Sequence, residues 1–256
     1  MSSKAVLFKT IFMKEWRILK SYAFNLVMSI LSIYILFLFV FYGMKAMASP
    51  IMFDNTAEGI IIGFLLWITS ILSVETLSWD LMEEAKVGTL EQLSMTPFGL
   101  GSISFFKILS SFVLNFIFII PIFLLMMLTT GMWLYINILS LLPLFIFALA
   151  SVWGLSFMLG GLVLIFKRIQ AVFQLIQWLL LGCIILSASA VSVFLPLAFG
   201  TRLIGEIMVS GASLLSLSPV DLLMLMANGA IYLGIGYFIF GQCIKISKKK
   251  GLLGQY

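Results

Sequence analysis

Acidic residues gather between positions 80 and 97, in the segment Asp80-Leu-Met-Glu-Glu-Ala-Lys-Val-Gly-Thr-Leu-Glu-Gln-Leu-Ser-Met-Thr-Pro97. Four of the ten Asp and Glu residues of the chain lie here, between two long apolar runs. Carboxylates are costly beside lipid but can pair with the cations of a binding partner. We therefore expect this segment to contact another molecule.

The same segment carries the signals of a short helix. Thr89 and Gln92 have the spacing of a capping box, in which the Thr89 hydroxyl accepts from the Gln92 amide and the Gln92 side chain bonds the Thr89 N–H. Gly88 permits a sharp chain reversal just before it. The pattern predicts a stiff helix over residues 90–95.

The next helix has a start signal of its own. Thr96 can cap it, and Pro97 suits its first position. The alternative is a loop that these residues merely cap and keep soluble, which is the usual role of a capping box.

Composition excludes several kinds of chemistry. The chain has no histidine, so it can form no HExxH zinc site, no Ser-His or Cys-His couple and no histidine proton relay. It also lacks the GxxxxGK[ST] phosphate-binding loop. We expect no enzyme, no metal site and no cofactor on this chain, so any ATP-driven work needs ATP and Mg²⁺ bound by a partner.

The class of protein follows from the apolar runs. With 62% hydrophobic and 10% charged residues, residues 1–256 are expected to form a single all-α, polytopic membrane unit. Each predicted span is long enough for a hydrocarbon core of about 30 Å. The six spans are Tyr22 to Met44, Gly59 to Trp79, Ile103 to Thr130, Ile138 to Phe166, Ala171 to Leu195 and Asp221 to Ile244.

Basic residues predict the orientation. If the N-terminus is cytoplasmic, 13 of the 15 Lys and Arg residues lie inside, and only Lys45 and Arg202 lie outside. Both termini and the acidic segment are then cytoplasmic in a multi-pass cell-membrane protein. The same topology explains the net charge of +5, so we expect no nucleic-acid partner.

The acidic segment also supports a family likeness. Its residues 84–97 closely resemble the E-x-x-x-G-T-L-E-Q-L-x-x-T-P segment of membrane subunits (permeases) of type-2 ATP-binding-cassette (ABC) exporters. Span count, cytoplasmic termini and length agree with that family, so the resemblance covers essentially the whole chain.

The resemblance implies a bacterial or archaeal exporter in which two permeases, identical or different, assemble with two ATPase chains. It makes the segment a coupling helix that docks on the ATPase. The short outer segment 45–58 resembles the compact branch, whose substrates include drugs, peptides, lipids and glycolipids. The residues implied in coupling are Glu83, Glu84, Gly88, Thr89, Leu90, Glu91, Gln92, Leu93, Thr96 and Pro97.

Residues 1–21 are expected to form an amphipathic helix at the cytoplasmic membrane surface. Its apolar stripe includes Phe8, Phe12 and Trp16, with Arg17 among the basic residues elsewhere on the helix. Trp16 is a natural interfacial anchor. A simple lipid anchor is one interpretation, and the family resemblance adds a second, in which the helix flanks the ATPase.

Residues 196–220 are too apolar for a solvated loop, so we expect a short pair of re-entrant helices at the outer face. The family has a comparable element proposed as an exit gate, which makes Pro196, Arg202, Glu206 and Pro219 candidate gate residues. Ser218 and Pro219 are expected to cap and start the last span.

A polar line on the fifth span is the candidate pathway. Gln170, Gln174 and Gln177 share one helix face, which would continue outward to Ser192. Glutamines in a membrane serve equally as interhelical hydrogen-bond partners. Because the line is uncharged and mostly apolar beyond Gln177, it favours an amphiphilic or hydrophobic substrate.

Two other functions stay open. Glu75, the one ionisable residue inside a span, would suit an ion-coupled secondary transporter, although its place near the cytoplasmic interface favours a structural role. The chain could also be a membrane scaffold whose acidic loop recruits a soluble partner.

Overall fold

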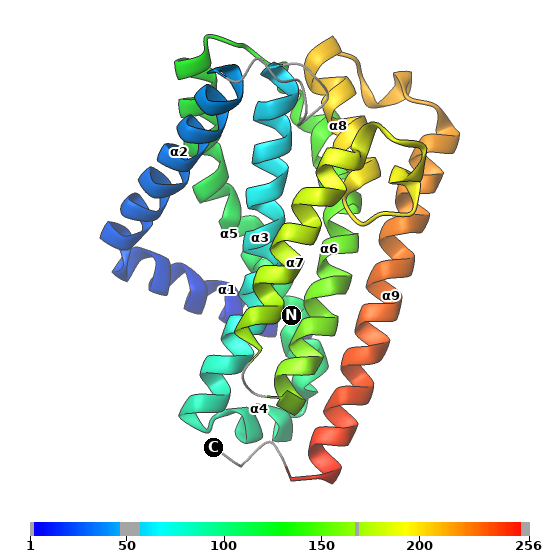
Figure 1. Cartoon of the computed structure of the whole chain (residues 1–256). Coiled ribbons are helices and arrows are strands. Elements are labelled where there is room, and N and C mark those ends of the chain that lie inside the picture. The colour runs from blue at the N-terminus through cyan, green and yellow to red at the C-terminus, as the bar shows by residue number, and fades with distance from the viewer. Residues whose placement is uncertain (1–2, 47–56, 167–168, 252–256) are drawn as a thin grey trace.

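The computed structural model describes residues 3–46, 57–166 and 169–251, and every regular element in these ranges is a helix (Figure 1). Six of these helices are long and apolar enough to cross a membrane, which confirms the predicted number of spans. Residues 47–56 of the predicted outer segment 45–58, and Lys167 and Arg168 of the orientation argument, lie outside the described residues. The six helices are α2 (Ala23–Ala46), α3 (Ala57–Val87), α5 (Gly99–Thr130), α6 (Ile138–Phe166), α7 (Gln170–Ile185) and α9 (Pro219–Lys249).

The second span is longer than predicted. We expected it to end at Trp79, but α3 continues to Val87, so residues 80–87 form its last two turns rather than a loop. Leu, Met, Glu, Ala and Lys are good helix formers, and no breaker occurs before Gly88. Three of the four acidic residues, Asp80, Glu83 and Glu84, therefore lie on a rigid extension of the span.

The fifth span is shorter than predicted. Helix α7 ends at Ile185, and two short 3₁₀ turns, η1 (Leu186–Ala188) and η2 (Ala190–Val193), follow it. The expectation that one continuous helix face runs from Gln170 to Ser192 is therefore wrong. Ser189, whose extended backbone separates the two turns, directs the chain away from the helix axis.

Helices α6 and α9 pack backbone to backbone, because glycines leave no side chain between them. A Cβ on Gly154 would lie 2.8 Å from the Leu233 nitrogen and closer still to the Tyr232 carbonyl, and Gly236 faces Gly154 directly. Gly234, another glycine of α9, has open space around it and takes no part in this contact. The sequence indicated small residues on α9 but not which of them face α6.

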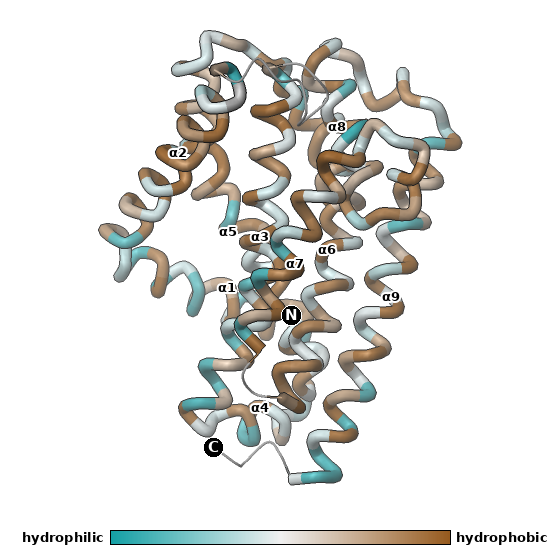
Figure 2. Tube along the Cα trace, viewed as in Figure 1, coloured by the Kyte–Doolittle hydropathy of each residue, from teal (hydrophilic) through white to brown (hydrophobic). Residues whose placement is uncertain are grey.

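Three further α-helices, α1, α4 and α8, lie in the described ranges. Helix α1 (Ser3–Ser21) crosses the direction of α2, and the chain turns at Tyr22 (Figure 1). Helix α4 (Leu90–Met95) lies between α3 and α5 at one end of the bundle, where Figure 2 shows hydrophilic residues also at the end of α9. Helix α8 (Ala198–Ser210) lies at the opposite end of α3 and is largely buried.

The segment 196–220 contains one α-helix, α8, and a three-residue 3₁₀ turn, η3 (Leu214–Ser216), where we expected a pair of helices. The start of α9 is as predicted. Pro219 is its first residue, and the Ser218 hydroxyl accepts from the Val220 N–H at 3.3 Å.

Candidate coupling site at the end of α3

A sharp reversal separates α3 from α4. Gly88 adopts a left-handed conformation with φ of +78°, and its N–H donates to the Ala85 carbonyl at 3.1 Å. A side chain there would meet nothing within 4 Å, so the requirement for glycine is conformational rather than steric. The predicted chain reversal is confirmed.

Thr89 does not form the expected capping box. Its backbone is helical, with φ of −83°, and its side chain makes no capping bond to α4. The Thr89 N–H donates to the Glu84 carbonyl at 3.0 Å, while the hydroxyl donates to the Glu84 carboxylate and lies 3.2 Å from the same carbonyl. The last carbonyls of α3 have no intrahelical N–H donor, and Thr89 provides donors to one of them, the Glu84 carbonyl. Gln92, the other half of the box, is exposed.

The exit from α4 also differs from the expectation. The Thr96 hydroxyl donates back to the Leu93 carbonyl at 2.8 Å and does not cap α5. Pro97 lies in the turn before α5, which begins at Gly99. The Thr96 N–H also donates to the Leu93 carbonyl, at 3.4 Å. Thr96 therefore ends α4 rather than starting α5. Both threonines stabilise the helix that precedes them.

One face of α4 is held by the rest of the bundle. Leu90 and Ser94 are buried, and Leu93 is half-buried. From α9, the Lys248 ammonium donates to the Ser94 carbonyl at 3.2 Å. Helices α3, α5 and α9 thus fix a helix of only six residues, which would not be stable alone.

The opposite face of this corner is exposed. Val87 and Met95 are each 73% exposed, and the acidic Glu91 lies between them in sequence. We call Val87, Gly88, Glu91, Gln92 and Met95 the coupling ridge. An apolar and acidic surface on a rigid support is suited to docking on a groove with basic and apolar residues.

Two ion-pair groups connect the corner to α1 and α5. Lys14 of α1 lies 3.3 Å from the Glu84 carboxylate, the same group that accepts from Thr89. One turn earlier in α3, Asp80 lies 2.6 Å from the Lys107 ammonium of α5, and Glu15 of α1 lies 3.9 Å from it. Three helices therefore share one network of charges.

Burial sets the electrostatics of this network. The Lys107 side chain is only 12% exposed, so its charge requires the two carboxylates. Burial raises the pKa of Glu15 above its ordinary value, and the attraction of Lys107 offsets this only in part. The orientation argument counted Lys107 only among the 13 cytoplasmic Lys and Arg residues, and Glu75 alone was considered as an ionisable residue inside a span. Lys107 also lies within the predicted third span, and that position was the available signal, because a lysine there needs a partner.

Helix α1 packs on α5 through part of its predicted stripe. The Phe8 ring lies 6.2 Å from that of Phe12 and 6.3 Å from that of Phe106 on α5. Trp16 is 49% exposed, and Arg17 is exposed as well. The stripe thus divides into a part that faces the bundle and a part that does not.

The candidate pathway residues are not brought together. Gln177 donates to the Glu75 carboxylate at 2.6 Å, so the two polar groups at mid-helix satisfy each other across α3 and α7. Gln170 and Gln174 are exposed on α7, and Ser192 is buried beyond its end. Gln177 therefore acts as an interhelical hydrogen-bond partner.

The candidate gate residues lie on three elements. Pro196 is buried before α8, Arg202 and Glu206 are exposed on α8, and Pro219 is exposed at the start of α9. Arg202 and Glu206 line a common cavity.

Comparison with known proteins gave no match to a family model, to a curated protein or to a solved structure. The likeness of residues 84–97 to a coupling segment therefore stays a hypothesis.

Proposed function

We propose that this chain is the membrane-spanning permease subunit of an ATP-driven ABC exporter that moves an amphiphilic or hydrophobic compound outward. One observation carries the proposal. The residues that resemble a coupling motif include a short helix, α4, which is anchored to α3, α5 and α9 and whose free face contributes Glu91, Gln92 and Met95 to the coupling ridge. A rigid, exposed corner of this kind can transmit movement from a docked partner into the spans.

The remaining parts of the assembly follow from this role. The chain has no phosphate-binding loop, so ATP and Mg²⁺ would be bound by two separate ATPase chains, and a second permease would complete the exporter. Helix α1 would lie on the cytoplasmic membrane surface, which its direction across α2 and its exposed Trp16 support (Figure 1).

The test is co-purification with the ATPase encoded by a neighbouring gene, followed by measurement of permease-stimulated ATP hydrolysis. Glu91→Lys reverses a charge on the coupling ridge, where the side chain is exposed, so it should reduce both readouts by about tenfold while leaving the thermal midpoint unchanged. Glu58→Lys makes the same reversal at the other end of α3 and serves as the matched control.

Gly88→Pro should uncouple more severely, because proline cannot adopt a φ of +78°. If Glu91→Lys and Gly88→Pro both leave assembly and stimulated hydrolysis intact, α4 is not the coupling element.

An ion-coupled carrier is the second candidate, and the Glu75–Gln177 pair is the observation that favours it. Transport that persists without ATP, collapses with the ion gradient and is lost in Glu75→Gln would decide for the carrier. Transport by Glu75→Gln that still follows ATP would decide against it.

A further inference from the structure

A cavity of about 500 Å³ lies at the end of the bundle opposite α4. It is lined by the first turns of α3, by the end of α7 with η1, and by one face of α8. Ile62 and Glu84 are separated by 22 residues of the same helix, so the cavity is about 33 Å from the coupling corner. It is large enough for the polar head and first carbons of an amphiphile.

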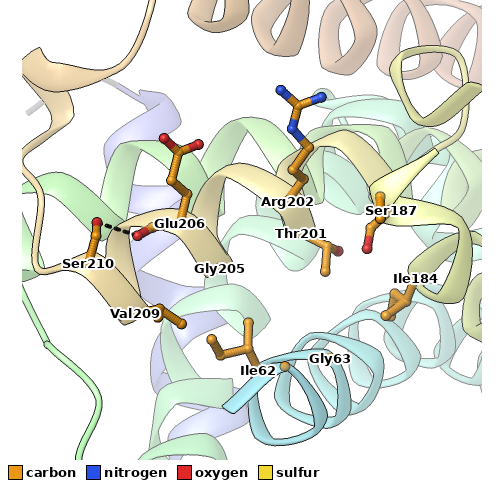
Figure 3. A pocket seen from close by; sticks show the side chains of 12 residues that line it. Ile62, Gly63, Ile184, Ser187, Thr201, Arg202, Gly205, Glu206, Val209 and Ser210 are labelled. Carbon is orange, nitrogen blue, oxygen red and sulfur yellow. Dashed lines mark hydrogen bonds between the residues drawn. The ribbon is translucent and has the colours of Figure 1, made fainter. Parts of the chain in front are cut away.

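The lining has a charged side and an apolar side. Arg202 and Glu206 extend in the same direction from α8, whereas Ile62, Ile184 and Val209 lie on the opposite side of the α8 ribbon in this view (Figure 3). Such a division matches a molecule with a polar head and a hydrocarbon part.

The two charges are available to a ligand. Arg202 and Glu206 are one helical turn apart, yet within the described ranges neither takes part in an ion pair. The Arg202 guanidinium instead lies 5.6 Å from the centre of the Phe199 ring, a cation–π contact that leaves its hydrogen-bond donors free. One free cation beside one free anion complements a ligand that carries both charges.

The three hydroxyl groups of the site differ in whether they already make a hydrogen bond. Thr201 donates to the Leu197 carbonyl and Ser210 to the Glu206 carbonyl, so both are engaged with their own helix. Ser187 lines the cavity, is 7% exposed and makes no hydrogen bond through its side chain among the described residues. It can donate to an anionic oxygen next to Arg202.

From these contacts we infer that the cavity binds the head group of a zwitterionic amphiphile, with its anionic group on Arg202 and Ser187, its cationic group on Glu206 and its hydrocarbon against Ile62 and Ile184. The inference rests on the proposed function only for the direction in which the ligand moves, since binding needs no ATPase. It narrows the substrate class from amphiphiles in general to those with both charges close together.

The test is a charge-preference assay on the purified full chain in a neutral maltoside. Native mass spectrometry measures the binding of dodecylphosphocholine, dodecyl phosphate and dodecyltrimethylammonium, each below its own micelle-forming concentration. The unaltered chain should bind the phosphocholine about tenfold more tightly than either singly charged probe, because each charged contact is worth about that factor.

Substitutions should change the preference rather than abolish binding. Glu206→Gln should favour dodecyl phosphate, Arg202→Gln should favour dodecyltrimethylammonium, and Lys45→Gln, a cation outside the cavity lining, should leave the ranking unchanged. The double exchange Arg202→Glu with Glu206→Arg should keep the phosphocholine first, since the pair of charges remains.

An unaltered ranking in both single variants, or no preference in the unaltered chain, would overturn the assignment. Either result leaves the coupling role untouched if Glu91→Lys still disrupts the ATPase complex. Conversely, if the single variants switch the preference but the chain recruits no ATPase, the binding site is confirmed and the proposed exporter function is wrong.

Discussion

Removal of the buried cation is the most demanding test of the charge network. Lys107→Met keeps the length and apolar packing of the side chain but leaves Asp80 and Glu15 without their shared partner. Breaking a fully buried pair costs about 3–5 kcal/mol. Asp80 keeps 32% of its side-chain surface exposed and either carboxyl can take up a proton, so we expect about 2–4 kcal/mol here.

The assay uses the two cysteines of the chain. Cys183 and Cys243 are free and buried, so a thiol-reactive dye reports unfolding in detergent. For a chain of this length the expected loss lowers the thermal midpoint by roughly 4–16 °C. Lys86→Met is the matched control, because Lys86 and its partner Glu83 are exposed and the pair contributes less than about 1 kcal/mol.

A second variant separates the lost attraction from a general loss of packing. In Lys107→Met/Asp80→Asn one of the two unpaired charges is removed, so the midpoint should recover by about half of the loss. If Lys107→Met lowers the midpoint no more than Lys86→Met does, the ion pairs of Lys107 with Asp80 and Glu15 contribute no more to stability than an exposed pair, and their assignment as a buried network is wrong.

Three further predictions use the same assay. Gly154→Leu should prevent α6 and α9 from packing and abolish a cooperative transition, whereas Gly234→Ala, with open space around it, should change the midpoint by less than about 2 °C. Gly88→Ala should cost about 1–2 kcal/mol through its φ of +78°, and no loss of midpoint would show that the turn relaxes. The pKa of Glu15 is raised in the fold, so folded Glu15 holds its proton at pH values where unfolded Glu15 has lost it, and stability falls as pH rises above about 4.5. Glu15→Gln should therefore flatten the fall of the midpoint as pH rises above about 4.5, and an unchanged slope would contradict the assigned burial.

Much of the fold was accessible from the sequence because a bilayer imposes simple requirements. Apolar runs of sufficient length predicted six spans, and six helices of that kind are present in the described residues. Helix α4 was predicted at residues 90–95 and α6 at 138–166, and both have these bounds. The Ser218 cap followed from local geometry alone.

Local signals were less reliable where two elements compete for one residue. Thr89 and Thr96 are residue types that favour N-caps, yet the hydroxyl of each donates to a carbonyl of the preceding helix. The last carbonyls of a helix lack intrahelical donors, and a threonine in the following turn lies close enough to bond them. The predicted polar line from Gln170 to Ser192 assumed one continuous helix. Helix α7 instead ends at Ile185, and the chain beyond it changes direction. The spacing of residues in a sequence does not show where a helix ends and the chain changes direction.

The sequence alone determined that the chain is helical, apolar over six spans and charged at one corner, since these are properties of each segment by itself. Only the tertiary structure decided which charges meet. Lys107, Asp80 and Glu15 are distant in sequence, and Gln177 finds Glu75 across two helices. A buried polar group must be satisfied by whatever packing brings within about 3 Å of it, and that packing depends on the whole bundle rather than on any one segment.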